Sequence, residues 1–373
     1  AFLVRVPGRQ GLYPLFQYHL AGDDTRYDLT RRDYRDFDLS AFWDAGAQLL
    51  RDPAPDTTFE ARCAGCHFTG YEAFAGPGGE RLARAVSDPA GVLDIDGDAQ
   101  PDEINIGCES CHGPGSQHAS HAASPVQASQ AGRYIVSPEH LSPSRQLMIC
   151  SRCHDQVVGA GTVASDAPLD ANDRMPEAGI SRTAFLAQHV SVKGPAPANL
   201  WSQGAYARTE HHPAADFLRS PKYRNDRILV TCQDCHSNHG QSRALHQLIH
   251  DHTDPTSLLC FRCHNLDHLD HKQATTGSTH AGIGTVCSRC HMPATARGGA
   301  GTVGIQFGPL TGTMADDDLI YYRGDRTSHL FGALPRRAHP DVAGETPTRA
   351  MPIPFTDGCG QGCHDATPLP LLA

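Results

Sequence analysis

The sequence predicts a fold made mostly of coil, with short α-helices and little β-structure. Only 39% of the residues are hydrophobic and 7% are aromatic, whereas 36 are glycine and 27 are proline, which is a thin supply for a conventional core. Stretches with helical or strand periodicity are short and few. One short cysteine motif recurs along most of the chain, so we expect the fold to be organised around these sites.

A few segments do show a regular pattern. Residues 38–50 begin with Asp38 or Ser40 as a cap and continue with apolar residues at helical spacing, which predicts a helix. The other predicted elements are helices at 181–190 and 243–251, a short strand at 228–230, and Gly/Pro-rich loops at 75–79, 194–198 and 298–304. No internal repeat is present beyond the cysteine motif itself.

The recurring motif predicts covalent haem attachment. Two thiols two residues apart can form thioethers to both vinyl groups of one porphyrin, and a histidine directly after them can ligate the iron. Six copies have the form Cys-x-x-Cys-His: Cys63/Cys66/His67, Cys108/Cys111/His112, Cys150/Cys153/His154, Cys232/Cys235/His236, Cys260/Cys263/His264 and Cys287/Cys290/His291. A seventh, Cys359/Cys363/His364, has one extra residue between its cysteines. The chain therefore has a place for seven haem c groups.

Other uses of the cysteines are weaker explanations. A zinc or redox site can imitate one copy of the motif, but six copies that all have histidine in the fifth place disfavour zinc. For the longer Cys359–Cys363 motif, a disulfide or free thiols are the alternative to haem. Seven motifs with two cysteines each account for all 14 cysteines, and this accounting favours haem.

The spacing of the motifs predicts the organisation of the chain. An extended chain is expected to wrap around a stack of seven haems, which would supply most of the buried apolar material. The predicted segments are a haem-free N-terminal arm (1–62), a three-haem lobe (63–154), a connecting segment (155–231), a three-haem cluster (232–291) and a C-terminal extension with the seventh haem (292–373). Without haem the chain is expected to be largely unfolded.

Net charge and hydropathy indicate which partners and which cellular location to expect. The net charge of −10 makes nucleic acid an unsuitable partner. Haem c is attached outside the cytoplasm, so we expect an exported protein, extracellular or at the cell surface, with the periplasm as the alternative. No apolar stretch reaches 18 residues, which predicts no transmembrane segment. Most of the cationic residues are arginine, and the only lysines are Lys193, Lys222 and Lys272. Arginines that pair with haem propionates or a genome that favours arginine codons explain this excess equally well.

Sixteen histidines lie outside the motifs, more than enough to fill the sixth position of every iron. A haem that carries electrons needs both axial positions occupied. His246 and His250 are four residues apart on the predicted helix at 243–251, so at least one of them should face a porphyrin. His268 and His271 are likewise alternatives. Of these pairs we take His250 and His271 as the ligands.

Parts of the chain resemble a known family. The stretch Gly107–His118 (GCESCHGPGSQH), Cys235–His239 (CHSNH) and Cys290–Pro293 (CHMP) are similar to multihaem cytochromes c of the OmcE/OmcS extracellular-filament type. The wider group includes tetrahaem and decahaem carriers, multihaem nitrite reductase and hydroxylamine oxidoreductase. The run from Trp201 through Asp216-Phe217 to Ser220 is also similar, and the likeness covers roughly residues 60–330.

This resemblance implies roles for further histidines. It implies that His118, His239 and His329 are distal ligands, together with His211 or His212, of which we take His211. In filament-forming members a histidine near the N-terminus completes a haem of the next subunit, which points to His19 here. A ligand within its own chain or a surface histidine is the alternative for His19.

An acidic stretch predicts a second type of metal site. Carboxylates alternate around a turn-forming glycine, an arrangement that can wrap oxygen ligands around Ca²⁺. The candidate ligands are Asp94, Asp96, Asp98 and Asp102. The glycine follows the second aspartate rather than the third, so the stretch is not an EF-hand. A solvated acidic turn is the alternative.

The predicted function is electron transport rather than catalysis. The resemblance implies a filament of head-to-tail copies with bis-histidine haems, which would pass electrons from redox partner proteins to an extracellular electron acceptor. The first alternative is an oxidoreductase with one open-face haem for nitrite, hydroxylamine or a sulfur oxyanion. All seven motifs end in histidine, unlike the lysine-ended motif of the related nitrite reductases. The second alternative is a monomeric periplasmic carrier.

Overall fold

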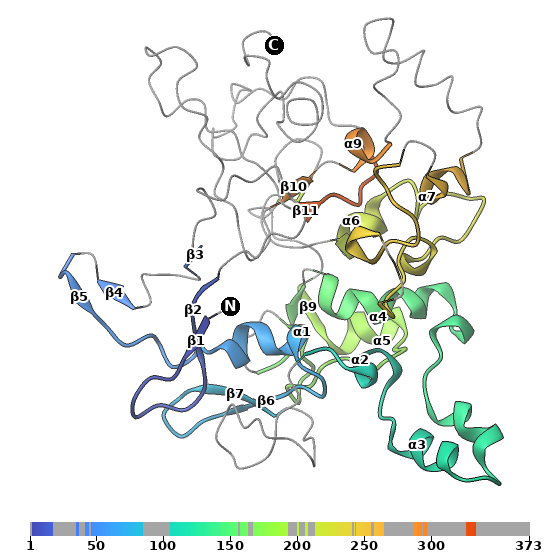
Figure 1. Cartoon of the computed structure of the whole chain (residues 1–373). Coiled ribbons are helices and arrows are strands. Elements are labelled where there is room, and N and C mark those ends of the chain that lie inside the picture. Colours follow the sequence, from blue (N-terminus) through green and yellow to red (C-terminus); the bar gives the residue numbers. More distant parts are fainter. Residues whose placement is uncertain are drawn as a thin grey trace, which may run out of the picture. The chain divides into compact units, whose positions relative to one another are not determined.

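The computed structural model confirms a fold of coil and short helices with little β-structure (Figure 1). It describes residues 2–17, 35–36, 42–44, 46–84, 105–155, 157–162, 167–192, 200, 206–207, 213–240, 242, 244–254, 257–264, 287–292, 294–296 and 326–332. The chain divides into two compact units, Ala1–Gly194 and Pro195–Ala373. In the parts of the chain that the structure describes, no helix is both long and apolar enough to cross a lipid bilayer.

The first unit contains small antiparallel sheets and short helices. Strands β1 (Phe2–Val4), β2 (Tyr13–Gln17) and β3 (Arg35–Asp36) form one sheet, and three strand pairs are formed by β4 (Trp43–Asp44) with β5 (Leu49–Leu50), β6 (Glu72–Ala75) with β7 (Arg81–Arg84), and β8 (Val158–Gly159) with β9 (Val190–Val192). The helices are η3 (Glu60–Ala64), α1 (Gly65–His67), α2 (Cys108–His112), α3 (Ser116–Ala123), η4 (Ala128–Tyr134), η5 (Pro138–His140), α4 (Pro143–His154) and α5 (Arg182–Gln188).

The N-terminal residues pack onto the segment that carries the first motif. Both carboxylate oxygens of the buried Glu60 accept hydrogen bonds from the Leu12 amide, at 3.0 and 3.1 Å. The Phe59 amide donates to the Leu12 carbonyl at 2.6 Å. Leu12 is therefore hydrogen-bonded to the start of η3, the helix that contains the first cysteine of the first motif.

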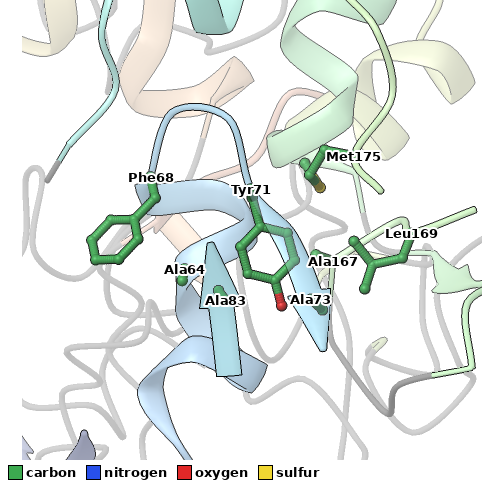
Figure 2. Close-up of a cluster of buried hydrophobic side chains, with 8 residues drawn as sticks. All are labelled: Ala64, Phe68, Tyr71, Ala73, Ala83, Ala167, Leu169 and Met175. Atoms are coloured by element: carbon green, nitrogen blue, oxygen red, sulfur yellow. The ribbon is translucent and has the colours of Figure 1, made fainter. Parts of the chain in front are cut away.

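A small core lies directly beside this motif (Figure 2). It brings together residues from η3, the following loop, the β6–β7 hairpin and the loop before α5. Its members are Ala64, Phe68, Tyr71, Ala73, Ala83, Ala167, Leu169 and Met175, with Phe59 and Cys153 packed against it. Four of the eight buried members are alanine, so the core buries little apolar area per residue.

The second unit has fewer regular elements. They are α6 (Pro213–Arg219), η7 (Cys232–Asp234), η8 (Leu245–Gln247), α7 (Leu258–Phe261), α9 (Cys287–His291) and the antiparallel pair β10 (Ala294–Ala296) and β11 (Arg326–Thr327). Most of these elements carry or adjoin a cysteine motif.

The predicted local elements had mixed outcomes. The helix at 181–190 is confirmed as α5, and the Ser181 hydroxyl accepts from the Ala184 amide at its start. The predicted loop at 75–79 is confirmed as the turn of the β6–β7 hairpin. The loops at 194–198 and 298–304 lie outside the described residues.

Three local predictions are wrong in the described residues. The helix at 38–50 is instead the β4–β5 pair over 43–50, because the Asp44 carboxylate accepts from the amides of Gly46 and Ala47 and closes a turn. The predicted strand at 228–230 is coil. In the predicted helix at 243–251, His246 and Gln247 have left-handed φ values of 59° and 57°, which interrupt a helix.

Candidate haem sites

Every motif that the structure describes lies on a short helical turn. The first spans η3 and α1, the second is α2, the third ends α4, and the sixth is α9. At the fourth and fifth, the histidine amide donates to the carbonyl of the first cysteine, as in His236 to Cys232 at 2.9 Å and His264 to Cys260 at 3.0 Å. One helical turn places residues i and i+3 on the same side, so both thiols can face one porphyrin.

The motif histidines are oriented by backbone carbonyls. The Nδ1 atom of His112 lies 2.6 Å from the Val136 oxygen, that of His236 lies 3.0 Å from His246, and that of His291 lies 3.2 Å from Phe331. A carbonyl oxygen only accepts hydrogen bonds, so each Nδ1 carries the proton. In its neutral form, this tautomer binds a metal through Nε2, and backbone carbonyls orient metal-binding histidines in the same way in known metal sites.

Burial favours the same neutral form at the first motif. His67 lies on α1 beside the small core, and burial lowers the pKa of its imidazole below the usual 6.5. A neutral imidazole is the form that binds a metal. The predicted role of His67 as an iron ligand therefore fits its surroundings.

The buried Thr69 joins the first and second motifs. Its hydroxyl donates to the Asn105 carbonyl at 3.0 Å and accepts from the Gly107 amide at 2.7 Å and from the Ser110 hydroxyl at 3.0 Å. Ser110 lies between the two cysteines of the second motif. The second motif is therefore tied to the residues that directly follow the first.

The third motif contacts both of the others through its second cysteine and the preceding arginine. A hydrogen bond between the thiols of Cys66 and Cys153 raises the pKa of the Cys66 thiol, and burial raises it further. Arg152 donates to the Ser110 carbonyl at 2.6 Å. The first three motifs thus meet in one place in the first unit, although long segments separate them in the sequence.

The fourth, fifth and sixth motifs meet in the second unit in the same way. A hydrogen bond between the thiols of Cys260 and Cys287 raises the pKa of Cys260, and burial adds to this effect. Arg262 donates to the Asp234 carbonyl at 3.4 Å, which links the fifth motif to the fourth. Each unit therefore contains three converging motifs.

One predicted distal ligand, His329, lies near a motif histidine. The rings of His236 and His329 have their centres 6.2 Å apart and their planes 24° apart. Two imidazoles that bind one metal from opposite faces, each through a bond of about 2 Å, have ring centres about 6 Å apart once a ring radius of about 1 Å is added on each side. If a haem were bound at the fourth motif, this spacing would allow both imidazoles to hold its iron.

The buried Asp216 on α6 positions His329. Its carboxylate accepts from the Ser328 hydroxyl at 3.0 Å, from the His329 amide at 3.4 Å and from Arg219 at 2.7 Å. Burial raises the pKa of Asp216 above its usual range, although Arg219 opposes this change. The Nδ1 atom of His329 lies 3.1 Å from the Thr327 carbonyl, so Nε2 would be the atom that binds a metal.

The remaining predicted ligands have varied positions. His118 lies on α3 with Nδ1 3.0 Å from the Ala131 carbonyl, so it too offers Nε2. His239 is exposed and His250 is half-buried. The expectation that His246 and His250 share a helical face is wrong, because residue 246 itself is left-handed. The other predicted ligands, which lie outside the described residues, are His19, His211, His271, Asp94, Asp96, Asp98, Asp102, Cys359, Cys363 and His364.

Two further residues could bind a haem iron and were not singled out from the sequence. His189 is buried at the end of α5, and its Nδ1 lies 3.1 Å from the Pro168 carbonyl. It has the same Nε2-exposing arrangement as the motif histidines, but no sequence pattern marks it. Lys222 is half-buried and donates to the Nε2 of His264, and burial lowers the pKa of its amine. Its only sequence signal is the scarcity of lysine.

Exposed apolar side chains precede three of the motifs in the sequence and could contact a bound porphyrin. Ile106, Leu229 and Leu258 stand two or three residues before the first cysteine and are 46%, 79% and 55% exposed. Each could lie against the flat apolar surface of a porphyrin bound at the adjacent motif. Within the described residues, no three His, Cys, Asp or Glu side chains form a site for a bare metal ion. The donor set and these apolar neighbours fit covalent haem.

Comparison with known proteins agrees with this chemistry. Over 121 residues, or 31% of the chain, the sequence is 26% identical to a protein named cytochrome c-554 from Nitrosomonas europaea. The chain spans less than half of that relative, 44% of its length. No protein-family model and no solved structure matches the chain. Together with the cysteine motifs, the similarity supports a c-type cytochrome with covalently bound haem.

Proposed function

We propose that this chain is a heptahaem c-type cytochrome that transfers electrons and is not an enzyme. The convergence of three motifs within each unit is the observation that carries the proposal. Thiols of different motifs touch at Cys66 with Cys153 and at Cys260 with Cys287. A thioether lies at the edge of its porphyrin, so contacting thiols favour neighbouring haems with adjacent edges.

Saturated iron would suit this role. An iron held on both faces changes its oxidation state with little change of geometry and leaves no position for a substrate. The pairing of His236 with His329 supports such ligation at the fourth haem. The oriented Nε2 atoms of His118 and His189 are candidates for the same role in the first unit.

The proposal also includes export and assembly. Haem c attachment and the likeness to cytochrome c-554 favour an exported protein, and we propose an extracellular location, with the periplasm as the alternative. Copies of the chain would join head to tail into a conductive filament, with His19 binding a haem of the next copy. Redox partner proteins would reduce the filament, and an extracellular acceptor would oxidise it.

A combined haem count and spectrum tests the electron-transfer role. Mass spectrometry of the purified protein should show seven haems per chain, one at each motif. The oxidised protein should show low-spin ferric signals without a high-spin haem that binds nitrite or hydroxylamine. Turnover of either compound at a high-spin haem would favour the open-face enzyme and contradict the proposal.

Electron microscopy of the same material tests the assembly. Fibres with a regular repeat are expected, and the His19→Ala variant should give single particles with one high-spin haem per chain. His118→Ala is the matched control, since it removes a histidine proposed to act within its own chain and should leave fibres intact. Single particles of the unaltered protein at every concentration would contradict the filament.

A further inference from the structure

We propose that Lys222 is the sixth ligand of the haem at Cys260/Cys263/His264, so that this haem has an amine where the others have an imidazole. The inference rests on haem attachment at this motif, which is part of the proposed function. Its basis is the direct contact between the Lys222 Nζ atom and the Nε2 atom of His264.

The contact occurs at the nitrogen that an iron would occupy. In three other motifs, Nδ1 lies against a backbone carbonyl, the arrangement in which a histidine binds a metal through Nε2. By the same arrangement, the Nε2 of His264 is the expected iron-binding atom. The Nζ of Lys222 is thus placed against the position of the metal, and not at the rim of the site.

The backbone around Lys222 is well fixed. The hydroxyl of the buried Ser220 donates to the Phe217 carbonyl at 2.7 Å and accepts from the Tyr223 amide at 3.3 Å. The rings of Phe217 and Tyr223 pack with their centres 5.7 Å apart. The turn after α6 therefore holds the backbone of residue 222 beside the fifth motif.

An iron between the two nitrogens requires about 4 Å between them, since each metal–nitrogen bond is about 2 Å long. The lysine side chain has four rotatable methylene groups and a single terminal nitrogen, so a change of rotamer can provide this separation. A guanidinium stays protonated and cannot replace the amine as a ligand. The site therefore distinguishes lysine from arginine.

The surroundings do not suggest an ordinary ion pair. Besides His264, the ionisable groups that act on Lys222 are the thiols of Cys235, Cys260, Cys263 and Cys287, which belong to three motifs. Attachment of haem converts each of these thiols to a neutral thioether. Within the described residues, no carboxylate forms a salt bridge with Lys222. The remaining rival partner is a haem propionate.

Substitution of Lys222 in the haem-loaded full chain separates these roles. In the unaltered protein, near-infrared magnetic circular dichroism and electron paramagnetic resonance should show one haem per chain with an amine–imidazole signature. Lys222→Ala and Lys222→Arg should both remove that signature and make one haem per chain high-spin. Lys222→His should restore a low-spin haem, now with bis-imidazole character.

The arginine variant is the decisive one, because it keeps the positive charge that a propionate needs. Unchanged spectra in Lys222→Arg would overturn the proposal and assign Lys222 to a propionate. Absence of the amine–imidazole signature from the unaltered protein would also overturn it. Arg227→Ala removes a cation from an exposed position five residues away; it is the control and should change nothing.

The haem count keeps this test separate from that of the proposed function. Mass spectrometry should find haem on Cys260 and Cys263 in the unaltered protein and in every variant. Loss of haem from this motif in the unaltered protein would contradict the heptahaem proposal itself. Intact haem with an imidazole as the sixth ligand would contradict only the role of Lys222.

Discussion

Asp216→Ala should release His329 from the fourth haem. The Asp216 carboxylate holds the segment 327–332 against α6 through the Ser328 hydroxyl at 3.0 Å and the His329 amide at 3.4 Å. A hydrogen bond to a charged acceptor contributes about 1.5–3 kcal/mol, and the longer of these two should contribute less than half of that. The substitution removes both hydrogen bonds and should therefore weaken the attachment of the segment to α6 by about 2 kcal/mol.

The remaining contacts keep the segment from detaching completely. The Tyr206 hydroxyl donates to the Gly332 carbonyl at 3.0 Å, and the rings of Phe217 and Phe331 pack with their centres 6.4 Å apart. A loss of about 2 kcal/mol corresponds to a roughly 30-fold larger population with His329 off the iron. Ser328→Ala removes the shorter of the two hydrogen bonds, worth about 1.5 kcal/mol, and should have a smaller effect, about tenfold.

Carbon monoxide binding to the reduced protein measures this population, because the gas binds only an iron with an open face. In Asp216→Ala, one haem per chain should bind carbon monoxide with an apparent affinity roughly 30-fold higher than in the unaltered protein. Asp226→Ala changes an exposed aspartate and is the control. An Asp216→Ala protein that is less stable but binds no more carbon monoxide would refute the assignment of His329 as an axial ligand.

Three other perturbations test local features. In Gly65→Ala, the added Cβ would overlap the Ala167 Cβ. The substitution should therefore lower the free energy of unfolding by about 1–3 kcal/mol and slow haem attachment at the first motif. An unchanged denaturation midpoint would contradict this. The backbone amides of Glu80 and Gly78 hold the pKa of Glu80 below 4.5. The ionised carboxylate therefore stabilises the folded protein above pH 4.5, and this contribution is lost as the pH falls through the lowered pKa. Glu80→Gln should make the free energy of unfolding depend less on pH in this acid range. If Ca²⁺ binds the predicted site, a calcium chelator should increase proteolysis at 94–102 in the unaltered protein but not in Asp96→Asn, which lacks one carboxylate ligand. Equal cleavage of the unaltered protein with and without chelator would favour a solvated acidic turn.

The sequence was a good guide to the chemistry of the sites and to the general fold, because both follow from local rules. The motif spacing alone places two thiols and a histidine on one helical turn, and the structure shows this at Cys232–His236. Helix α5 was equally predictable, because Ser181 caps a regular apolar pattern. Periodicity misled at 43–50, where the Asp44 side chain binds the turn amides and competes with the helix.

Contacts between distant segments were beyond the reach of periodicity. The strand expected at 228–230 is coil because strand propensity depends on a pairing partner, and in the described residues this segment has none. The ligand role of His329 was implied only by resemblance, whereas its partner His236 and its anchor Asp216 are visible only in the structure. No spacing rule connects Lys222 with His264 or marks His189 as buried.

The distribution of apolar side chains explains why the protein part of the fold is so slight. The core beside the first motif is half alanine, whereas larger side chains such as Leu229 and Leu258 stand exposed just before their motifs. A core of this kind buries little apolar surface per residue. Porphyrins covalently attached next to these side chains would supply the missing apolar contact. The same groups would then both stabilise the fold and carry the electrons, so loss of one haem should weaken its neighbours in the same unit as well as interrupt conduction.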